Sequence, residues 1–475
     1  MPSGNFVAAG GDTFVALMKR FMPECPTLCT DQQIINVLDS TVDKFLFSFG
    51  AGVNYKTKKL SGKHEQRFLK VINNMQSAPF MKNAKIYWDS GGFQVANGAF
   101  HPKDLPAFID MYYKCVEANP SMYSNAFILD CPPGPGSKDL FSSYDQIEKL
   151  NRMSYEKCLQ TISPQNLKKV IYIHHFRTPS LYDTWHKFLF DENLADGYEY
   201  FGTGGIVANL ASDIAIPIVL YTIPLSSILV YAKSKGLKKF KFHVLGGANF
   251  RDVFYHKLFE HHIREYHGID VEITFDSSAI FKAMFIGRHI HVFNHDNNVI
   301  KMDFRSGVLD TVLKGSDLSK IDPSKNITVR NKLYAVCDEL ANKYGFRKLD
   351  PLVDPIYDPM TNSLTKEMHV LMMSYVMEFT KQMELNCEML AKKIYPIYQS
   401  GAVADFNEAC NRITKMINQG KETKKQKAKS NCIFKSLKVL EQLDLDYNKM
   451  LVHQYMASDD ISSLNDGGDT IKWDA

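Results

Sequence analysis

The sequence predicts an α/β protein built on a TIM-type (β/α)8 barrel, followed by a mainly helical C-terminal module. Short runs of β-branched and aromatic residues alternate with helical patterns over about 250 residues, as a series of βαβ units does. Polar or glycine-rich segments follow several of these runs, and barrel enzymes carry their function at the carboxyl ends of the strands. With 475 residues, the chain is long enough for a barrel and a second module.

The predicted barrel strands are eight short runs bounded by turn residues. They cover residues 45–50, 85–89, 126–130, 170–174, 199–203, 241–245, 271–275 and 289–294. Helical patterns between them cover residues 105–118, 144–161, 181–190, 226–235 and 252–266. The chain therefore divides into an N-terminal helical lead-in (1–44), the barrel (45–300) and a mainly helical C-terminal region (301–475).

The C-terminal region begins with a loop punctuated by prolines at positions 351, 355 and 359. A long helix follows, and an apolar stripe at helical spacing predicts that one of its faces packs in a core. The stripe consists of Met368, Leu371, Met372, Tyr375, Phe379 and Met383. Serine, aspartate and glycine dominate from about residue 459, which predicts a frayed tail.

Composition places the chain among globular proteins, with 45% hydrophobic and 23% charged residues. A net charge of +4 is too small to identify a nucleic-acid partner by itself. Nine scattered cysteines and the lack of a secretory-type N-terminus favour a reducing cytoplasm. The uncharged stretch 214–232 contains Pro217 and Pro224, which predicts a loop entering a buried helix and not a membrane span.

The segment Asp89-Ser90-Gly91-Gly92-Phe93-Gln94 ends one predicted strand. Its carboxylate stands at the tip of the strand, and the paired glycines allow the backbone to approach a flat ligand. Phe93 can stack on a base that Ser90 helps to orient. Taken alone, the segment also fits a tight turn with a capping aspartate.

Asp130-Cys131 follows the next predicted strand in the same way. A carboxylate at a barrel mouth can accept two N–H donors from the Watson–Crick edge of guanine. An aspartate turn before the proline-rich loop is the alternative.

Two later strands end in glycines. Gly204-Gly205 can direct backbone N–H groups toward a ligand carbonyl, and Leu245-Gly246 can place an apolar lid over a planar ring. A plain glycine bulge explains either segment equally well when it is considered alone.

Asp276 ends the seventh predicted strand. An isolated carboxylate at this place can attack an anomeric carbon and form a covalent glycosyl intermediate. The alternative is a helix N-cap.

In this order, the motifs resemble the tRNA-guanine transglycosylase superfamily over about residues 45–300. Residues 89–94 reproduce the family's DSGGFQ element. Asp130-Cys131 resembles its base-reading aspartate, Gly204-Gly205 its double glycine, Leu245-Gly246-Gly247 its glycine turn, and residues 268–276 its nucleophile segment. The resemblance implies Asp276 as nucleophile and Asp89 as general acid and base, with the other residues binding the base. Asp276 is then expected to be ionised and Asp89 to change protonation state.

Two departures from the family narrow the prediction. The family usually has a zinc site of three closely spaced cysteines and a distant histidine, and this chain lacks the cysteine triplet, so neither zinc nor another cofactor is expected. The family also has a glutamine near the end of the fourth strand, where this chain has His174 and His175. Contacts to the base at this place must therefore differ from those of the family. These losses fit the divergent DNA-guanine transglycosylases of phages and some bacteria, the DpdA family.

Resemblance to that branch implies exchange of guanine in DNA for a free 7-deazaguanine such as 7-cyano-7-deazaguanine. The target nucleotide would have to leave the base stack, with or without helper proteins that open the duplex. Basic clusters would hold phosphates, which makes binding salt dependent. The lysines expected to do so are Lys238, Lys239, Lys421, Lys424 and Lys425.

Three other hypotheses stay open at this stage. The acceptor could be tRNA, or the chain could be a catalytically silent nucleic-acid-binding paralogue, although it retains both Asp89 and Asp276. The third is a metal-dependent barrel hydrolase using His174, His175 and His243, which lack a tight ligand motif.

Overall fold

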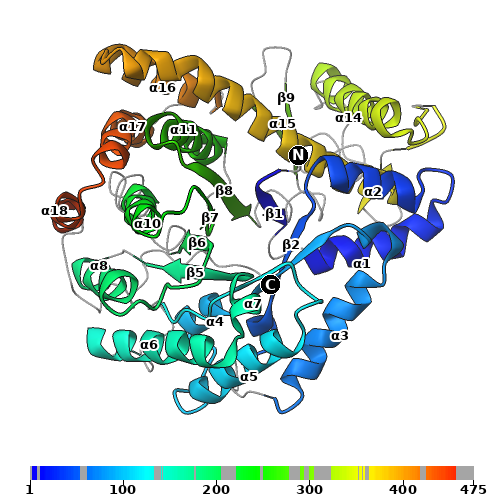
Figure 1. The fold of residues 1–475 in the computed structure, drawn as a ribbon. Helices are drawn as coiled ribbons and strands as arrows, with labels where there is room; N and C mark the ends of the chain where they lie inside the picture. The colour runs from blue at the N-terminus through cyan, green and yellow to red at the C-terminus, as the bar shows by residue number, and fades with distance from the viewer. Residues whose placement is uncertain are drawn as a thin grey trace.

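Eight parallel strands pair side by side in chain order and close into a barrel (Figure 1). The strands are β1 (Asn5–Val7), β2 (Lys44–Ser48), β3 (Lys85–Asp89), β4 (Asn125–Phe127), β5 (Val170–His174), β6 (Tyr200–Thr203), β7 (Lys239–Val244) and β8 (Asp270–Ser277). Helices alternate with the strands and surround them, so the predicted (β/α)8 barrel with a helical C-terminal region is confirmed.

This computed structural model describes most of the chain. The described residues are 3–7, 11–53, 61–132, 141, 143–175, 178–204, 221–246, 250–277, 289–293, 299–303, 323–350, 352–355, 357–358, 363–417 and 424–455. The predicted frayed tail lies outside them.

The helices of the barrel layer follow its strands in order. They are α1 (Gly11–Phe21), α2 (Asp31–Ser40), α3 (His64–Gln76), α4 (Gly92–Ala96), α5 (Leu105–Ala118), α6 (Tyr144–Thr161), α7 (Pro164–Leu167), α8 (Pro179–His186), α10 (Ile223–Ser234) and α11 (Phe250–His267). Short 3-10 segments cover Met22–Glu24, Phe49–Gly52 and Pro79–Met81, and a π-helical turn covers Lys187–Asp191.

The remaining elements follow the barrel strands in the sequence. They are the hairpins β9 (His289–Phe293) with β10 (Val299–Asp303) and β11 (Tyr357–Asp358) with β12 (Ser363–Leu364), and the helices α14 (Pro323–Tyr344), α15 (Lys366–Gln399), α16 (Val403–Ile417), α17 (Lys424–Gln442) and α18 (Leu445–Tyr455).

The barrel starts earlier than the sequence predicted. The lead-in 1–44 contains β1, which lies between β2 and β8 and pairs Phe6 with Asp276. The prediction that residues 289–294 form the eighth barrel strand is wrong, because β9 pairs antiparallel with β10 in a separate hairpin. Asp89 therefore ends the third barrel strand and Asp276 lies near the end of the eighth.

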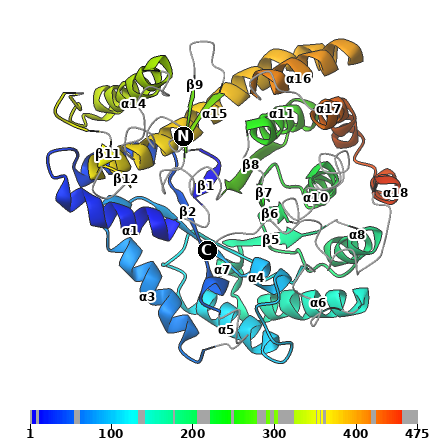
Figure 2. The ribbon, with the colours of Figure 1, turned by 180° about the vertical axis from the view of Figure 1, so that it is seen from behind.

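Helix α15 occupies the position of the eighth barrel helix. It packs along α11, which follows β7, and it also contacts α1, which follows β1. Both ribbon views place it beside β8 and β1 (Figures 1 and 2). The stripe predicted for core packing is buried in the structure, as expected. The C-terminal region thus supplies part of the barrel's own helical layer.

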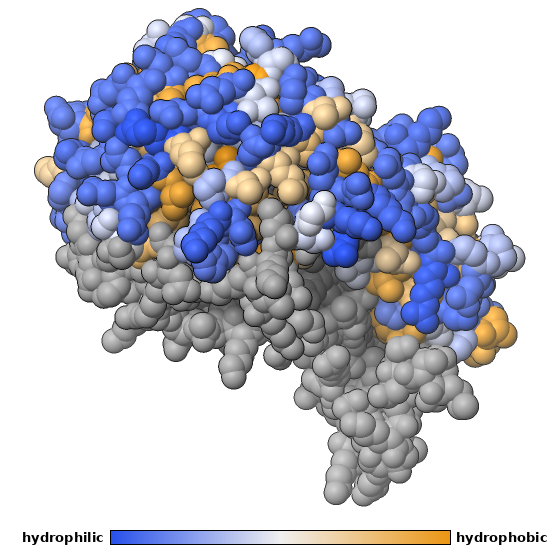
Figure 3. Space-filling view, turned by 90° about the horizontal axis from the view of Figure 1, so that it is seen from below, coloured by the Kyte–Doolittle hydropathy of each residue, from blue (hydrophilic) through white to orange (hydrophobic). Residues whose placement is uncertain are grey.

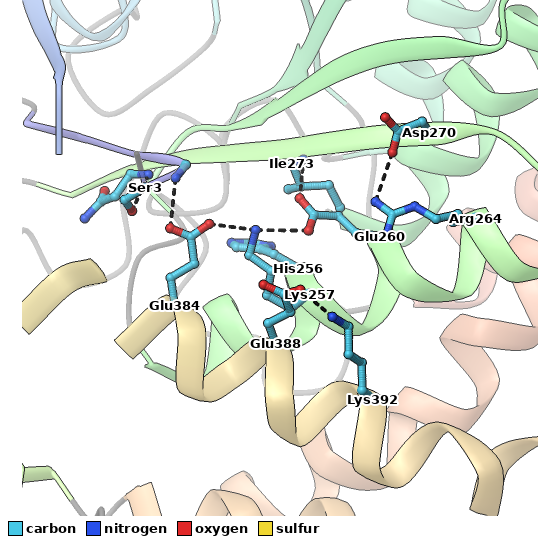
Figure 4. Close-up of polar contacts among 12 residues, drawn as sticks. Ser3, His256, Lys257, Glu260, Arg264, Asp270, Ile273, Glu384, Glu388 and Lys392 are labelled. Atoms are coloured by element: carbon cyan, nitrogen blue, oxygen red, sulfur yellow. Dashed lines mark hydrogen bonds and ion pairs between the residues drawn. The ribbon is translucent and has the colours of Figure 1, made fainter. Parts of the chain in front are cut away.

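A buried ionic network joins α11 and α15 to the seam between β1 and β8 (Figure 4). Lys257 Nζ lies 3.0 Å from Glu260 Oε2 and 2.7 Å from Glu384 Oε1. The backbone N–H of Gly4 donates to Glu384 at 2.9 Å, and that of Ile273 donates to Glu260 at 2.6 Å. These contacts satisfy backbone donors that the three-residue strand β1 leaves without a strand partner.

Glu384→Gln is expected to lower the free energy of unfolding by about 3 kcal/mol, because it leaves Lys257 with a weaker buried partner. Burial alone would raise the pKa of Glu384, but the charge and hydrogen bond of Lys257 outweigh it and lower the pKa to about 2. The stabilisation is therefore complete above the ordinary carboxyl pKa and is lost as the pH falls toward 2. Urea unfolding at several pH values measures both effects.

The matched control is Glu388→Gln, one turn further along α15. Glu388 pairs with Lys392 at 2.6 Å, and both side chains are about half exposed, so this change should cost well under 1 kcal/mol. Equal losses of stability in the two variants would contradict the conclusion that the buried Lys257–Glu384 pair stabilises the seam between β1 and β8.

Figure 3 shows one face of the molecule, where hydrophilic side chains predominate and hydrophobic ones form small patches. Within the described ranges, no helix combines the length and hydropathy needed to cross a bilayer. The uncharged stretch noted in the sequence enters α10, whose residues are mostly buried.

Candidate active site

Three carboxylates lie at the carboxyl ends of three barrel strands. Asp89 is the last residue of β3, Asp130 comes three residues after β4, and Asp276 is the penultimate residue of β8. Because all eight strands are parallel, these ends open on the same mouth of the barrel. The charges of Asp130 and Asp276 both act on Asp89, so the three groups are close neighbours.

The surroundings of Asp89 shift its pKa. Burial raises its pKa, and repulsion from Asp130 and Asp276 adds to this, while hydrogen bonds from Ser48 and the Gly91 amide act in the opposite direction. The result is a pKa of about 6. A carboxyl group with this pKa exchanges its proton near neutral pH, as a general acid and base must.

The glycines after Asp89 are required by close packing. Gly91 has φ +103°, a left-handed conformation, and a Cβ there would lie 2.9 Å from the Cα of Gly50. A Cβ on Gly92 would lie 3.0 Å from Cγ of Asp130 and closer still to its carboxylate oxygen. The pair therefore brings the backbone after β3 against the carboxylate after β4.

Asp130 is held by a histidine. It is 6% exposed, and Oδ2 is paired with Nε2 of the buried His175. Gly204 leaves room for this pair, because a Cβ there would collide with the His175 ring. The Gly204 N–H donates to the His174 carbonyl at 3.2 Å. Gly204 therefore shapes the wall of the site, and its amide is not the free donor that the sequence analysis expected.

Asn151 of α6 clamps the backbone beside Asp130. Its Oδ1 accepts from the Cys131 N–H at 2.7 Å, and its Nδ2 donates to the Cys131 carbonyl at 3.0 Å. The Cys131 side chain is fully buried in the core. Cys131 thus supports the position of Asp130 through its backbone, its thiol is buried, and its assignment as a base-binding residue stays a prediction.

Asp276 is fixed through one of its two oxygens. Gly246, with φ +90°, donates its N–H to Asp276 Oδ1 at 2.7 Å. Nε2 of His243 lies 3.4 Å from the same oxygen. Among the described residues, no hydrogen bond reaches Oδ2. The glycine turn after β7 therefore orients the carboxylate and leaves one oxygen open to the mouth.

The remaining predicted base contacts differ in accessibility. Ser90 is fully buried, and its hydroxyl has no hydrogen-bond partner in the described part of the chain. Phe93 is 58% exposed, whereas Gln94 is buried and accepts a hydrogen bond from Ser48 at 3.3 Å. Leu245 is half-buried and packs against the core. Ser90 and Phe93 are thus the more available for a ligand, while Gln94 braces β2 against α4.

Of the predicted phosphate-binding lysines, the structure describes the side chains of two, and neither lies at this mouth. Lys238 and Lys239 stand at the amino end of β7, and Lys239 lies 3.8 Å from Asp270 at the start of β8. Five residues of strand, roughly 17 Å, separate that end from the mouth, so this pair lies away from the three carboxylates, and its contact with phosphates stays a prediction. Gly205 and Lys421 lie outside the described residues, as do the side chains of Lys424 and Lys425 in α17.

The histidines of the hydrolase hypothesis do not converge. The ring of His174 packs near Phe242 on the outer face of the sheet, with a hydrogen bond to the backbone of Pro224 in α10. His243 follows Phe242 and therefore points to the inner face, where its ring contacts Phe6 and Phe127. Within the described ranges, no cluster of His, Cys, Asp or Glu is arranged to hold a metal ion.

Sequence reasoning missed four residues that build the site. Ser48 and Asn151 gave no signal, because isolated polar residues in a strand end or a helix are common. His243 was considered only as a metal ligand, and His175 as a metal ligand or as part of the region that replaces a family glutamine. His243 could have been predicted from the strand order. It pairs with Thr274 in the neighbouring strand, two residues before Asp276.

Comparisons with known proteins add no assignment. No protein-family model matches the chain, and no curated protein matches it in sequence. The resemblance therefore rests on the short motifs and on the places that those motifs occupy in the barrel.

Proposed function

We propose that the protein is a base-exchanging guanine transglycosylase that replaces guanine in DNA by a 7-deazaguanine such as 7-cyano-7-deazaguanine. The observation that carries the proposal is the pairing of two carboxylates in unlike environments at one barrel mouth. Asp89 has a pKa of about 6, whereas Asp276 is held by a backbone N–H on Oδ1 and has no hydrogen bond to Oδ2 within the described part of the chain. Unlike environments are what separate acid–base and nucleophilic duties between two carboxylates.

In the first half-reaction, Asp276 attacks C1′ of a flipped-out deoxyguanosine. A bond forms between the carboxylate oxygen and C1′ as the C1′–N9 bond breaks, and the electron pair stays on guanine, which takes a proton from Asp89. Asp130 accepts hydrogen bonds from N1–H and the exocyclic amine. It can do so although it is paired with His175, because a carboxylate offers about four acceptor sites.

In the second half-reaction, N9 of the incoming 7-deazaguanine loses its proton to Asp89 and attacks C1′. The ester bond to Asp276 breaks, and its electron pair returns to the carboxylate. Two inversions give net retention at C1′. Ser90 and Phe93 are suited to orient and stack the base, since the buried Ser90 hydroxyl has no partner among the described residues and the Phe93 ring is exposed.

The choice of DNA over tRNA rests on the missing cysteine triplet and on the helical C-terminal region. It is tested by incubating the protein with labelled guanine and either duplex DNA, single-stranded DNA or tRNA, followed by mass analysis of nucleosides after addition of 7-cyano-7-deazaguanine. We expect incorporation into DNA. Incorporation only into tRNA would move the assignment to the tRNA-acting relatives. No incorporation into any acceptor, with the protein folded, would favour a silent binding paralogue.

A further inference from the structure

A chain of buried polar groups leads from the interior of the barrel to the nucleophile. Tyr200 Oη lies 2.5 Å from Thr274 Oγ1, and Thr274 Oγ1 lies 2.9 Å from His243 Nδ1. His243 Nε2 faces Asp276 Oδ1 at 3.4 Å. The His243 and Thr274 side chains are fully buried and Tyr200 is nearly so. Such a chain costs free energy unless each member is satisfied, so its presence calls for a role.

Of the two directions that these hydrogen bonds can take, one gives both hydroxyl protons an acceptor, whereas the other leaves the Tyr200 proton without an acceptor among the described residues. Tyr200 donates to Thr274, Thr274 donates to Nδ1 of His243, and Nδ1 must then be the unprotonated nitrogen. The ring proton is left on Nε2, which completes no hydrogen bond among the described residues and points at Asp276. Catalytic hydrogen bonds are often long without substrate and shorten in the complex.

We propose that His243 is a positioning residue for Asp276, an inference that rests on the proposed function. Its Nε2–H and the Gly246 N–H hold Oδ1 in place, so that Oδ2 is the oxygen that bonds to C1′. When the glycosyl ester breaks in the second half-reaction, the same two donors meet the negative charge that returns to the carboxylate. Thr274 and Tyr200 fix the tautomer that makes this possible.

His243 could instead be present only to fill space in the core. This explanation predicts the opposite order of activity for two variants of His243. The ring centroid lies 4.6 Å from that of Phe6 and 5.0 Å from that of Phe127, so the imidazole also fills space. His243→Phe keeps an aromatic ring there but removes the donor. His243→Gln loses the ring but can place an amide N–H near the position of Nε2.

The experiment compares these two variants in single-turnover base exchange. If His243 positions Asp276, the Gln variant is more active than the Phe variant, and the loss in the Phe variant falls on kcat with the KM for DNA unchanged. If His243 only packs, the Phe variant is the more active, which overturns the proposal.

Thr274→Val keeps His243 and tests the tautomer directly. We expect exchange to fall by roughly 10- to 100-fold, the range found for groups that orient a catalytic ligand. Thr203→Val is the matched control, since Thr203 is also buried in a neighbouring strand but its hydroxyl has no partner in the described structure. Equal effects of the two valines would overturn the proposal.

A readout without turnover separates this inference from the proposed function. In protein labelled with 15N-histidine, the His243 signals, identified by their loss in the Gln variant, should report a protonated Nε2 that shifts in Asp276→Asn and changes tautomer population in Thr274→Val. If the variants show these shifts but wild-type protein exchanges no base, the His243–Asp276 contact is supported. The transglycosylase function is then refuted. An Nε2 that carries no proton in wild-type protein refutes the positioning role, whatever the activity.

Discussion

Asp276→Asn is expected to lower base exchange by at least about 10⁴-fold, because the amide cannot form the glycosyl ester that divides the reaction into two steps. The substitution changes one atom and keeps an oxygen that can accept the Gly246 N–H, so the folded structure should be preserved. Covalent capture gives a second readout. Wild-type protein mixed with DNA and denatured should carry a protein–DNA adduct, and the Asn variant should carry none.

The control for this prediction lies in the same strand. Asp270 begins β8 at the far end of the barrel, where it is about half exposed and pairs with Arg264 at 2.9 Å. Asp270→Asn makes the same chemical change and should leave both exchange and adduct formation close to wild type. Full activity in the Asp276 variant would remove the nucleophile assignment and with it the proposed mechanism.

The sequence predicted long, strongly patterned elements well. Helices α5 and α6 begin and end where their patterns do, and seven of the eight predicted strands overlap a barrel strand. Strand β1 was not predicted, because three residues are too few to show a periodic pattern. Its position depends on backbone contacts to Glu384 and β8. Its omission led to the choice of β9 as the eighth strand, since residues 289–294 have suitable β propensity but pair elsewhere.

The candidate site was predictable where one residue type at a strand end defines the chemistry, as for Asp89, Asp130 and Asp276. It was not predictable where function depends on contacts between distant segments. In the sequence, Gly204 and Cys131 look like ligand contacts. In the structure, Gly204 leaves room for the His175 ring, and the backbone of Cys131 is hydrogen-bonded to Asn151. The sequence also did not show at which end of β7 Lys238 and Lys239 lie, because a charge cluster does not reveal which end of a strand it occupies.

Opposite pH dependences are expected for the two half-reactions, because both use Asp89 but in different protonation states. Release of guanine needs the protonated acid, so its single-turnover rate should fall as the pH rises above about 6, the pKa of Asp89. Capture of the 7-deazaguanine needs the carboxylate, so its rate should rise through the same pH. Release of labelled guanine and incorporation of the second base, each measured from pH 5 to 8, separate the two.

Asp89→Asn should remove both dependences and lower exchange by about 10²- to 10⁴-fold, the usual contribution of general acid–base catalysis. Ser48→Ala gives a subtler variant, since it removes a hydrogen bond that lowers the pKa of Asp89 and should therefore move both profiles to higher pH. The pKa is raised by burial and by two neighbouring carboxylates, so its position reports on the whole site. Profiles that run in the same direction for both half-reactions would show that another group carries the proton.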